Sequence, residues 1–187
     1  MITFYMIRHG QTDWNREKRL QGRQNTPMND FGVAQIKELS EKIATKNLRV
    51  DYFLSSPLKR AKDSALIIAE GIGYGGEIIF DRDITERDFG LLEGTVWNPD
   101  INVNDPKYKC EPPDVLCERA RKAIEKYNFP EGSNVLIVAH GAILSAIRNV
   151  LSNGTISYEY RRNPILQGNV LCCEKEDGKA GVFSTMF

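Results

Sequence analysis

The chain has only two histidines, and imidazole is the side chain that most readily transfers a proton or acts as a nucleophile near neutral pH. His9 comes just after the apolar run Thr3–Ile7, and His140 directly follows Val135–Ala139. Glycine follows each histidine, which allows a sharp turn and the close approach of a ligand. Short apolar runs of this kind predict buried strands. If these strands are parallel neighbours in a sheet, both imidazoles lie at one edge of the domain.

Two arginines are placed to reach the same edge. Arg8 adjoins His9, and Arg60 falls in the first turn of a helix expected after the strand Tyr52–Leu54. Guanidinium groups that converge on one pocket bind phosphate well, because each presents a fork of N–H donors. Backbone N–H groups near Ala142, at the start of the helix expected after the second histidine, also favour an anion. Together these groups indicate a phosphoryl site rather than a zinc site.

Each of these residues also has an ordinary structural explanation. A single histidine at a strand end is usually structural, and an arginine such as Arg60 in a first helical turn is more often a surface residue. Two further polar residues have similar explanations: Glu86 would most often be a solvated loop charge, and Asn15 could be a turn residue. We prefer the catalytic interpretation because independent strand ends supply matching chemistry.

The composition is that of a globular domain, and we expect a single domain over residues 1–187. The hydrophobic fraction is 41% and the charged fraction 27%, as in soluble globular proteins. The 25 Lys and Arg residues are balanced by 25 Asp and Glu residues, so nothing argues for binding to nucleic acid or an anionic membrane. A negatively charged substrate must therefore be attracted by a local cluster of positive charge.

The cysteines Cys110, Cys117, Cys172 and Cys173 form no C-x-x-C pair, and two histidines are too few for a zinc-binding pattern. We therefore expect neither a metal nor a cofactor. The start Met1–Ile7 is apolar but lacks the basic region and the length of a signal peptide. No apolar stretch is long enough to span a bilayer. These features predict a cytoplasmic protein with reduced thiols and no membrane partner.

Strand and helix patterns alternate along the chain. The expected strands are Thr3–Ile7, Tyr52–Leu54, Ile78–Phe80 and Val135–Ala139, with two weaker ones near Gly168–Cys173 and Gly181–Met186. The expected helices run from Asn29 and Asp30 to about Lys46, from the N-cap Ser56 and first residue Pro57 to Gly71, over Leu116–Tyr127, and from Gly141 to Leu151. This alternation predicts an α/β layer fold with a mostly parallel sheet. Ligands of such folds bind beyond the carboxyl ends of the strands, which is where both histidines stand.

The segment Thr95–Pro113 has no clear period and is rich in Asn, Asp and Pro, which is typical of a loop that covers a site. Its aromatic residues Trp97 and Tyr108 are candidates for shaping a substrate pocket. Packing in a small satellite core explains them equally well.

Five local sequences resemble, in the same order, the motifs of one enzyme family. They are Arg8-His9-Gly10-Gln11-Thr12-Asp13-Trp14-Asn15, the segment Gln21–Met28, the segment Ser55–Ala61, the segment Glu86–Gly94, and Ala139-His140-Gly141. They are similar to the R-H-G-x-[ST]-x-x-N, Q-G-x-x-D-x-P-L, S-S-x-L-x-R-A, E-x-x-x-G-x-x-E-G and late H-G elements of the histidine phosphatase superfamily, the phosphoglycerate mutase-like proteins. The resemblance covers residues 4 to about 150. It implies a three-layer α/β/α sandwich with a mostly parallel central sheet.

Two positions depart from the family pattern. Asn25 stands where the family usually has Asp, and Met28 stands where it usually has Leu. Both lie in a loop expected to border the site, so they bear on the structure of that loop rather than on the chemistry.

The resemblance implies a role for each motif residue, with a small phosphorylated compound as substrate. His9, neutral at its attacking nitrogen, would take the phosphoryl group. Arg8, Arg60 and His140 would stabilise the charge on the equatorial phosphoryl oxygens. Glu86 would protonate the leaving oxygen and then activate water. Four further residues would contact the phosphoryl group or the substrate: Thr12, Asn15, Gln21 and Gly22.

Three functions stay open at this point. The first is a phosphatase acting on small phosphomonoesters. The second is a phosphoglycerate mutase, which is a phosphotransferase. The third is a catalytically inactive phosphate-binding or scaffold protein, and the presence of all five expected catalytic residues argues against it.

The residues around the expected site favour the phosphatase over the mutase. The loop Thr95–Pro113 is slightly acidic, and therefore suits the second anionic group of a phosphoglycerate poorly. Its charged residues are Lys107, Lys109, Asp100, Asp105 and Glu111. Ala142 offers no side-chain hydrogen bond where the mutases tend to carry Asn, and the Glu93-Gly94 ending resembles the phosphatase branch. Against this, the pair Arg161-Arg162 could serve as the missing anion clamp. The physiological substrate and the oligomeric state stay open.

Overall fold

The computed structural model describes residues 1–159 and 164–187 of the chain, which form a mixed α/β fold. The strands are β1 (Ile2–Arg8), β2 (Tyr52–Ser55), β3 (Ile78–Phe80), β4 (Asn134–Ala139), β5 (Leu171–Lys175) and β6 (Val182–Thr185). The helices are α1 (Asp13–Arg16), α2 (Asp30–Ala44), α3 (Lys59–Gly71), α4 (Pro113–Glu125) and α5 (Gly141–Leu151). Three short 3-10 turns are η1 (Arg82–Ile84), η2 (Gly90–Leu92) and η3 (Pro106–Tyr108).

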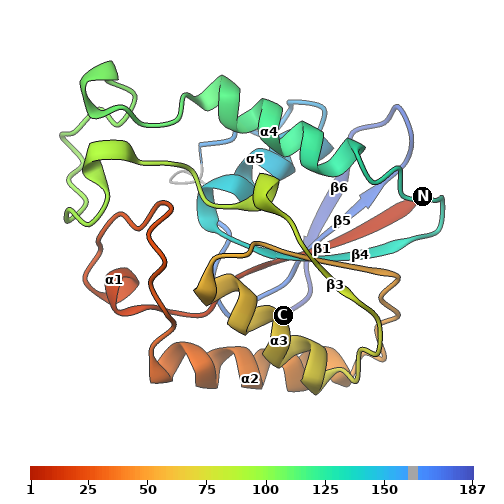
Figure 1. The fold of residues 1–187 in the computed structure, drawn as a ribbon. Coiled ribbons are helices and arrows are strands. Elements are labelled where there is room, and N and C mark those ends of the chain that lie inside the picture. The colour runs from red at the N-terminus through yellow and green to blue at the C-terminus, as the bar shows by residue number, and fades with distance from the viewer. Residues whose placement is uncertain (160–163) are drawn as a thin grey trace.

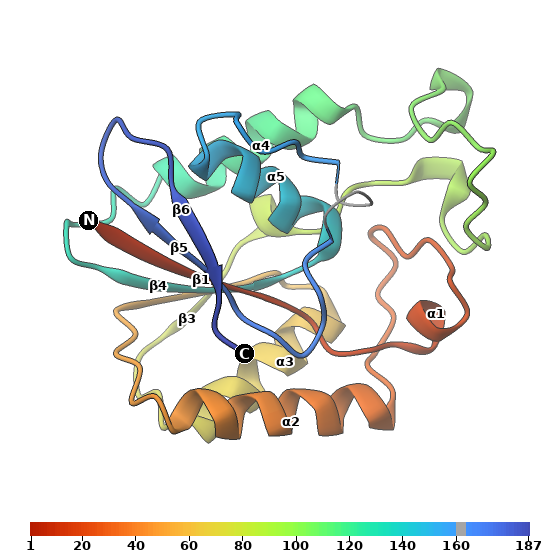
Figure 2. The same cartoon turned by 180° about the vertical axis from the view of Figure 1, so that it is seen from behind.

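The strands form one sheet in the order β3-β2-β4-β1-β5-β6. Strands β1 to β4 pair in parallel, whereas β5 and β6 add an antiparallel edge. Helices α2 and α3 cover one face of the sheet, and α4 and α5 cover the other (Figure 1). Seen from behind, β5 and β6 lie in front of β1, at the edge of the sheet (Figure 2). The predicted three-layer sandwich with a mostly parallel sheet is therefore confirmed.

Two hydrophobic clusters fill the space between the sheet and its two helical layers. One contains Phe4, Met6 and Ile137 with residues of α4 and α5, and the other contains Ile7 and Val138 with residues of α2 and α3. Successive residues of β1 and β4 thus face opposite layers, and both faces are covered. This explains why the central strands are continuous apolar runs rather than alternating ones.

The predicted element positions hold best in the core. Helix α5 has the predicted bounds, and β5 and β6 form near the two weaker predicted strands. The start of α3 was predicted wrongly, because Leu58 rather than Ser56 is the N-cap and the first helical residue is Lys59. Ser56 Oγ is in contact with His140 Nε2 at 2.8 Å, and it accepts the Leu58 N–H at 3.3 Å.

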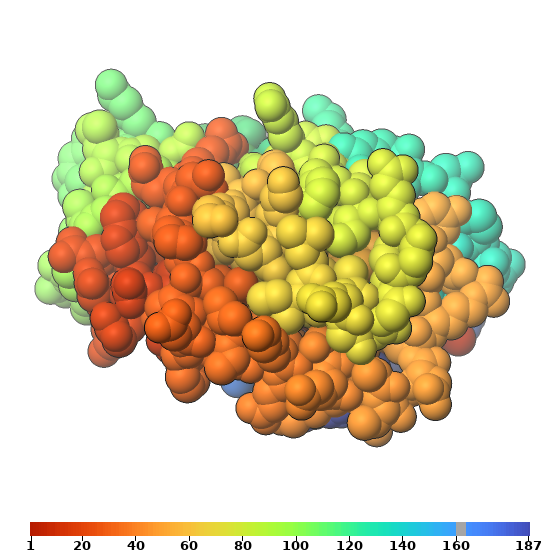
Figure 3. All heavy atoms as spheres, turned by 60° about the horizontal axis from the view of Figure 1, so that its bottom comes forward, coloured from red at the N-terminus to blue at the C-terminus, as the bar shows by residue number. Residues whose placement is uncertain are grey.

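The loops after the parallel strands gather at one end of the sheet, beside α1 (Figure 1). An isolated antiparallel bridge pairs Arg19 with Val96 and joins the segment after α1 to the loop after η2. Figure 3 looks onto the face made by α2 and α3, and shows the early loops in red beside the green segment around residue 95. In the described part of the chain, no helix combines the length and the apolar character needed to cross a membrane.

Candidate active site

Both histidines stand at the carboxyl ends of adjacent parallel strands, as their positions in the sequence predict. The register pairs Arg8 of β1 with Ala139 of β4, and the His9 N–H donates to the Ala139 carbonyl at 3.0 Å. The two imidazole rings lie with their centroids 5.0 Å apart. Sheet pairing therefore brings together two side chains that are 131 positions apart in sequence.

Hydrogen bonds fix the orientation and the tautomer of His9. Its Nδ1 lies 2.7 Å from the Gly10 carbonyl oxygen, which can only accept, so Nδ1 carries the proton. Its Nε2 lies 3.2 Å from Arg60 Nε, which can only donate, so Nε2 holds a lone pair. This is the arrangement that a nucleophilic imidazole nitrogen requires.

The surroundings keep His9 neutral. The side chain is buried, and burial together with the positive charges of Arg60 and Arg8 holds the pKa of His9 well below its usual value of 6.5. A neutral ring at ordinary pH keeps its lone pair available for attack.

Arg60 lies at the centre of the site and is fully buried. Its guanidinium donates to the Gln24 carbonyl at 2.7 Å and to the Gly22 carbonyl at 2.8 Å, in addition to His9. Burial lowers the pKa of Arg60 to about 10, with Glu86 and Glu93 acting in the opposite direction. The side chain thus stays charged near neutral pH, and its fork is fixed next to His9 Nε2.

Glu86 follows η1 and occupies the N-terminus of α5. Its carboxylate accepts the backbone N–H groups of Ala142 and Ile143 at 3.1 Å, and that of Arg87 at 2.9 Å. The helix N-terminus expected to face a ligand anion therefore receives a carboxylate of the chain itself. This binding fixes the position of Glu86 at the edge of the site.

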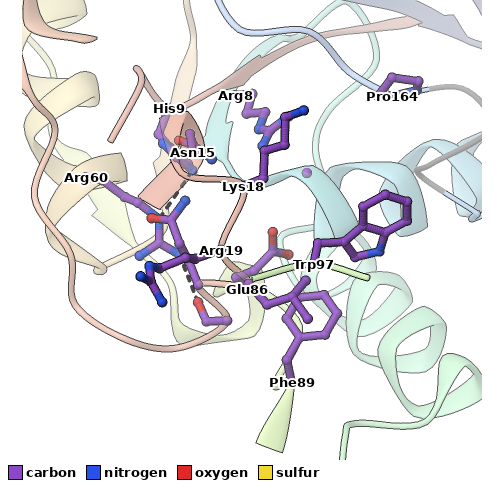
Figure 4. A pocket seen from close by; sticks show the side chains of 14 residues that line it. Arg8, His9, Asn15, Lys18, Arg19, Arg60, Glu86, Phe89, Trp97 and Pro164 are labelled. Atoms are coloured by element: carbon purple, nitrogen blue, oxygen red, sulfur yellow. Dashed lines mark hydrogen bonds between the residues drawn. The ribbon is translucent and has the colours of Figure 1, made fainter. Parts of the chain in front are cut away.

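A pocket of about 580 Å³ opens beside these groups (Figure 4). Its lining residues are Arg8, His9, Asn15, Lys18, Arg19, Leu20, Gln21, Gly22, Arg60, Glu86, Phe89, Trp97, Gly141 and Pro164. Figure 4 shows Arg8, Arg60 and Glu86 around one space with His9. Seven of the nine predicted site residues therefore line one cavity, which has room for a leaving group beyond a phosphoryl group.

Thr12 and His140 lie behind the wall of the pocket instead of lining it. Thr12 caps α1, and its hydroxyl donates to Gln21 Oε1 at 2.9 Å. Asn15 Oδ1 accepts from the Thr12 N–H at 3.1 Å and from Gln167 Nε2 at 3.2 Å. In this geometry Thr12 supports two lining residues, Asn15 and Gln21.

His140 is fully buried beneath His9. Its Nε2 contacts Ser56 Oγ, while its Nδ1 has no hydrogen-bond partner among the described residues. Burial, followed by the charge of Arg60, holds the pKa of His140 well below 6.5. Both imidazoles of the site are thus neutral.

The sequence interpretation missed two cations that line the pocket, Lys18 and Arg19. Lys18 has a left-handed backbone (φ 57°) just after α1, and this turn brings the following residues to the pocket. Arg19 donates to the Gly94 carbonyl at 2.8 Å. Two charged residues after a short helix match no sequence pattern that would predict a position at a pocket.

The two aromatic candidates of the covering loop, Trp97 and Tyr108, have different surroundings in the structure. Trp97 lines the pocket and is 37% exposed. Tyr108 instead packs against a satellite cluster formed by Leu20, Phe89 and Leu92. Of the two candidates in the loop, Trp97 therefore lines the pocket and Tyr108 packs in the satellite cluster.

The two departures from the family pattern have clear contacts. Asn25 Oδ1 accepts the Lys59 N–H at 2.7 Å and so caps α3 from another loop. Met28 Sδ lies 3.0 Å from the Ser64 hydroxyl, which accepts the Gly10 N–H and donates to the Arg60 carbonyl. Both residues therefore pack against elements that carry the site, and neither of them lines the pocket. The pair Arg161-Arg162 lies outside the described residues.

Comparison with known proteins assigns the family. The family model described as the histidine phosphatase superfamily (branch 1) matches residues 4–182. The uncharacterized phosphatase PhoE of Bacillus subtilis is 36% identical over 162 residues, which are 82% of this chain and 79% of that protein. The metal-independent phosphoserine phosphatase of Arabidopsis thaliana is 32% identical over 157 residues, covering 76% of this chain and 65% of that protein. Other relatives bear the name probable phosphoglycerate mutase GpmB.

A solved structure agrees with the fold. The chain titled Bacillus stearothermophilus YhfR superposes with a TM-score of 0.81 at 24% identity, and the match covers 100% of this chain and 96% of that one. The chain belongs to the histidine phosphatase superfamily, whose related proteins carry the names of phosphatases and mutases.

Proposed function

We propose that the chain hydrolyses small phosphomonoesters in two steps through a phosphohistidine on His9. One observation carries the proposal: a neutral imidazole, protonated at Nδ1, presents Nε2 to a buried arginine at the wall of a pocket. A lone pair next to fixed positive charge is suited to attack phosphorus, because the charge stabilises the transferring oxygens.

In the first step, His9 Nε2 forms a bond to phosphorus while the bond to the leaving oxygen breaks. Arg60 Nε, which now donates to the ring nitrogen, then donates to a phosphoryl oxygen, and Arg8 contacts another. Glu86 gives a proton to the leaving oxygen. The neutral ring of His140, whose centroid lies 5.0 Å from that of His9, limits the position of the His9 ring.

In the second step, Glu86 takes a proton from water, the oxygen of that water forms a bond to phosphorus, and the bond between phosphorus and His9 Nε2 breaks. The bonding of Glu86 suits this step well, because its carboxylate accepts backbone N–H groups and keeps its position at the pocket. Inorganic phosphate leaves, and His9 returns to its neutral form. No three His, Cys, Asp or Glu side chains gather as a potential metal site within residues 1–159 and 164–187, and each step is assigned to protein groups alone.

Trapping the intermediate tests this proposal. Rapid acid-free quenching after mixing with a small aryl phosphate, in the presence of EDTA, should give a chain heavier by one phosphoryl group at His9. A panel of phosphomonoesters then defines the substrate. Turnover without a labelled histidine, or activity that needs an added divalent ion, would contradict the mechanism.

Phosphoglycerate mutase is the second candidate, because Lys18 and Arg19 line the pocket and provide the positive charge that the covering loop lacks. The deciding assay supplies 3-phosphoglycerate with a trace of 2,3-bisphosphoglycerate. The phosphatase proposal expects release of inorganic phosphate. Rapid formation of 2-phosphoglycerate with little free phosphate would establish the mutase instead.

A further inference from the structure

Glu93 is a motif residue that the proposed mechanism does not use, and it is not among the residues that line the pocket. It ends the short turn η2 and is partly buried. Its Oε1 accepts the Arg23 N–H at 2.8 Å and the Phe89 N–H at 3.3 Å, and its Oε2 accepts from Gln24 Nε2 at 2.8 Å. The carboxylate therefore holds the loop at residues 22–24 through the Arg23 backbone N–H and the Gln24 side-chain amide.

Backbone carbonyls of the same loop accept hydrogen bonds from the Arg60 guanidinium. The Gly22 carbonyl accepts from Arg60 at 2.8 Å, and the Gln24 carbonyl accepts from it at 2.7 Å. A third Arg60 N–H reaches His9 Nε2. The Arg23 N–H and the Gly22 carbonyl belong to one peptide group, so a continuous series of hydrogen bonds leads from the Glu93 carboxylate, through this peptide group, to the guanidinium and to His9.

Gly22 shows how closely the loop and the carboxylate fit. Its φ is +52°, which favours glycine, and a Cβ built on it would lie 1.9 Å from Glu93 Oε1. Any side chain at this position would push the carboxylate away from the loop. The backbone conformation and the carboxylate therefore depend on each other.

Arg60 is a buried cation without an acidic side chain in direct contact: within the described residues it forms no ion pair, and its side chain donates to two carbonyls, a ring nitrogen and, at 3.5 Å, the Thr26 hydroxyl. A direct ion pair would neutralise the charge needed at the phosphoryl group. Through the loop, Glu93 can stabilise and orient the guanidinium while its front stays open to a ligand.

We propose that Glu93 is a positioning residue for phosphoryl transfer, which acts through the backbone of residues 22–24 to hold Arg60 in register with His9. This inference rests on the proposed function only in that Arg60 binds the transferring phosphoryl group. Loss of the carboxylate charge frees the loop, and the guanidinium then loses its fixed direction.

The test compares Glu93→Gln, which keeps the shape of the side chain, with Arg60→Lys and with the double variant. A misplaced catalytic group costs up to about a hundredfold in rate, so we expect Glu93→Gln to lower kcat/KM by about tenfold to a hundredfold. Inhibition by vanadate, an analogue of the transferring phosphoryl group, should weaken by a similar factor. Glu38→Gln, which removes an exposed carboxylate on α2, is the matched control and should change neither value.

The double variant decides between positioning and general stability. If Glu93 acts through Arg60, adding Glu93→Gln to Arg60→Lys costs little more, because the shared effect is already lost. Full additivity, or a Glu93→Gln variant with wild-type vanadate inhibition, would overturn the inference. If Glu93→Gln does not fold, Gln24→Ala replaces it in the same cycle, since it removes one carboxylate contact and keeps the carbonyl. An Arg60→Lys variant with unchanged kcat/KM would instead refute the proposed phosphate clamp itself.

Discussion

The floor and the mouth of the pocket are built on different principles. The floor, which consists of His9, Arg60 and Glu86, is buried, and each of its polar groups is held by backbone or side-chain hydrogen bonds. The mouth, which consists of Lys18, Arg19 and Trp97, is partly or fully exposed and is carried by loops. Figure 4 shows both around one space.

This difference separates chemistry from selectivity. A preorganised floor needs no rearrangement when charge develops on a phosphoryl group, which is the main source of catalysis in such reactions. In the proposed reaction, an exposed mouth would contact only the leaving group, whose shape differs between substrates. The floor should therefore determine whether the chain acts on phosphomonoesters at all, and the mouth should determine which of them it prefers.

Removal of the nucleophile is the most severe test of the floor. The variant H9A should lose at least about 10³-fold in kcat, together with all phosphoryl labelling, because no other group can form the intermediate. Circular dichroism should show an unchanged fold. Acid-labile phosphate incorporated at the normal rate would show that the nucleophile is elsewhere.

Glu86 tests the second function of the floor. The variant E86Q should lower kcat by about 10²- to 10⁴-fold for poor leaving groups, which need a proton. An activated aryl phosphate leaves without a proton, so its first step should survive. Because the second step lacks its base, the phosphohistidine should then accumulate. An equal fall in kcat for both substrates, without accumulation of the phosphohistidine, would mean that Glu86 only positions the substrate.

Lys18 is the sharpest probe of the mouth. Within the described residues, no hydrogen bond or ion pair engages its ammonium, and it lines the pocket beyond the phosphate clamp. We expect K18M to raise KM for phosphoserine by about three- to tenfold and to leave KM for phosphoethanolamine, which lacks the carboxylate, unchanged. K37M on α2 is the control. Equal effects on both substrates would remove Lys18 from selectivity.

Two residues of the floor, His9 and Arg60, could be predicted from the sequence because they stand at fixed points of regular elements, whereas Glu86 lies in a loop and is indicated only by the family motif. A histidine directly after a buried strand has one place to go once the sheet is parallel, and Arg60 follows from the start of a helix. The local contacts could not be predicted. That Ser56 contacts His140 instead of capping α3, or that Asn25 caps this helix from a distant loop, depends on tertiary packing.

The two cations of the mouth escaped prediction for a related reason. Lys18 and Arg19 reach the pocket because α1 is short and the chain turns through a left-handed residue after it. Lysine is an unusual residue in that conformation, so the sequence gave no sign of the turn. The same limit applied to the covering loop, where packing alone separates Trp97 from Tyr108.

Acid should destabilise the whole fold through the two buried imidazoles. Burial, with the charge of Arg60, holds the pKa values of His9 and His140 below 6.5, whereas both side chains gain protons near 6.5 when the chain unfolds. The unfolded state therefore binds more protons below about pH 6.5, and the free energy of unfolding falls as pH falls. Urea titrations between pH 7.5 and 5.5 should show this slope, and H140Q should reduce it. A flat profile would mean that the imidazoles are not buried neutral.

Asn25 offers the smallest and most specific test, because it supports the floor without touching the substrate. Its amide oxygen accepts the Lys59 N–H at the start of α3, one residue before Arg60. The variant N25D keeps this acceptor and adds a negative charge at a helix N-terminus, which should stabilise the fold by about 0.3–1 kcal/mol. For a chain of this size that corresponds to a rise in Tm of about 1–4 °C. Since Arg60 keeps its carbonyl contacts, kcat should stay the same. A change in kcat without a change in Tm would show that the added charge acts on the guanidinium, and that the floor is less insulated from its supporting loops than its hydrogen bonds indicate.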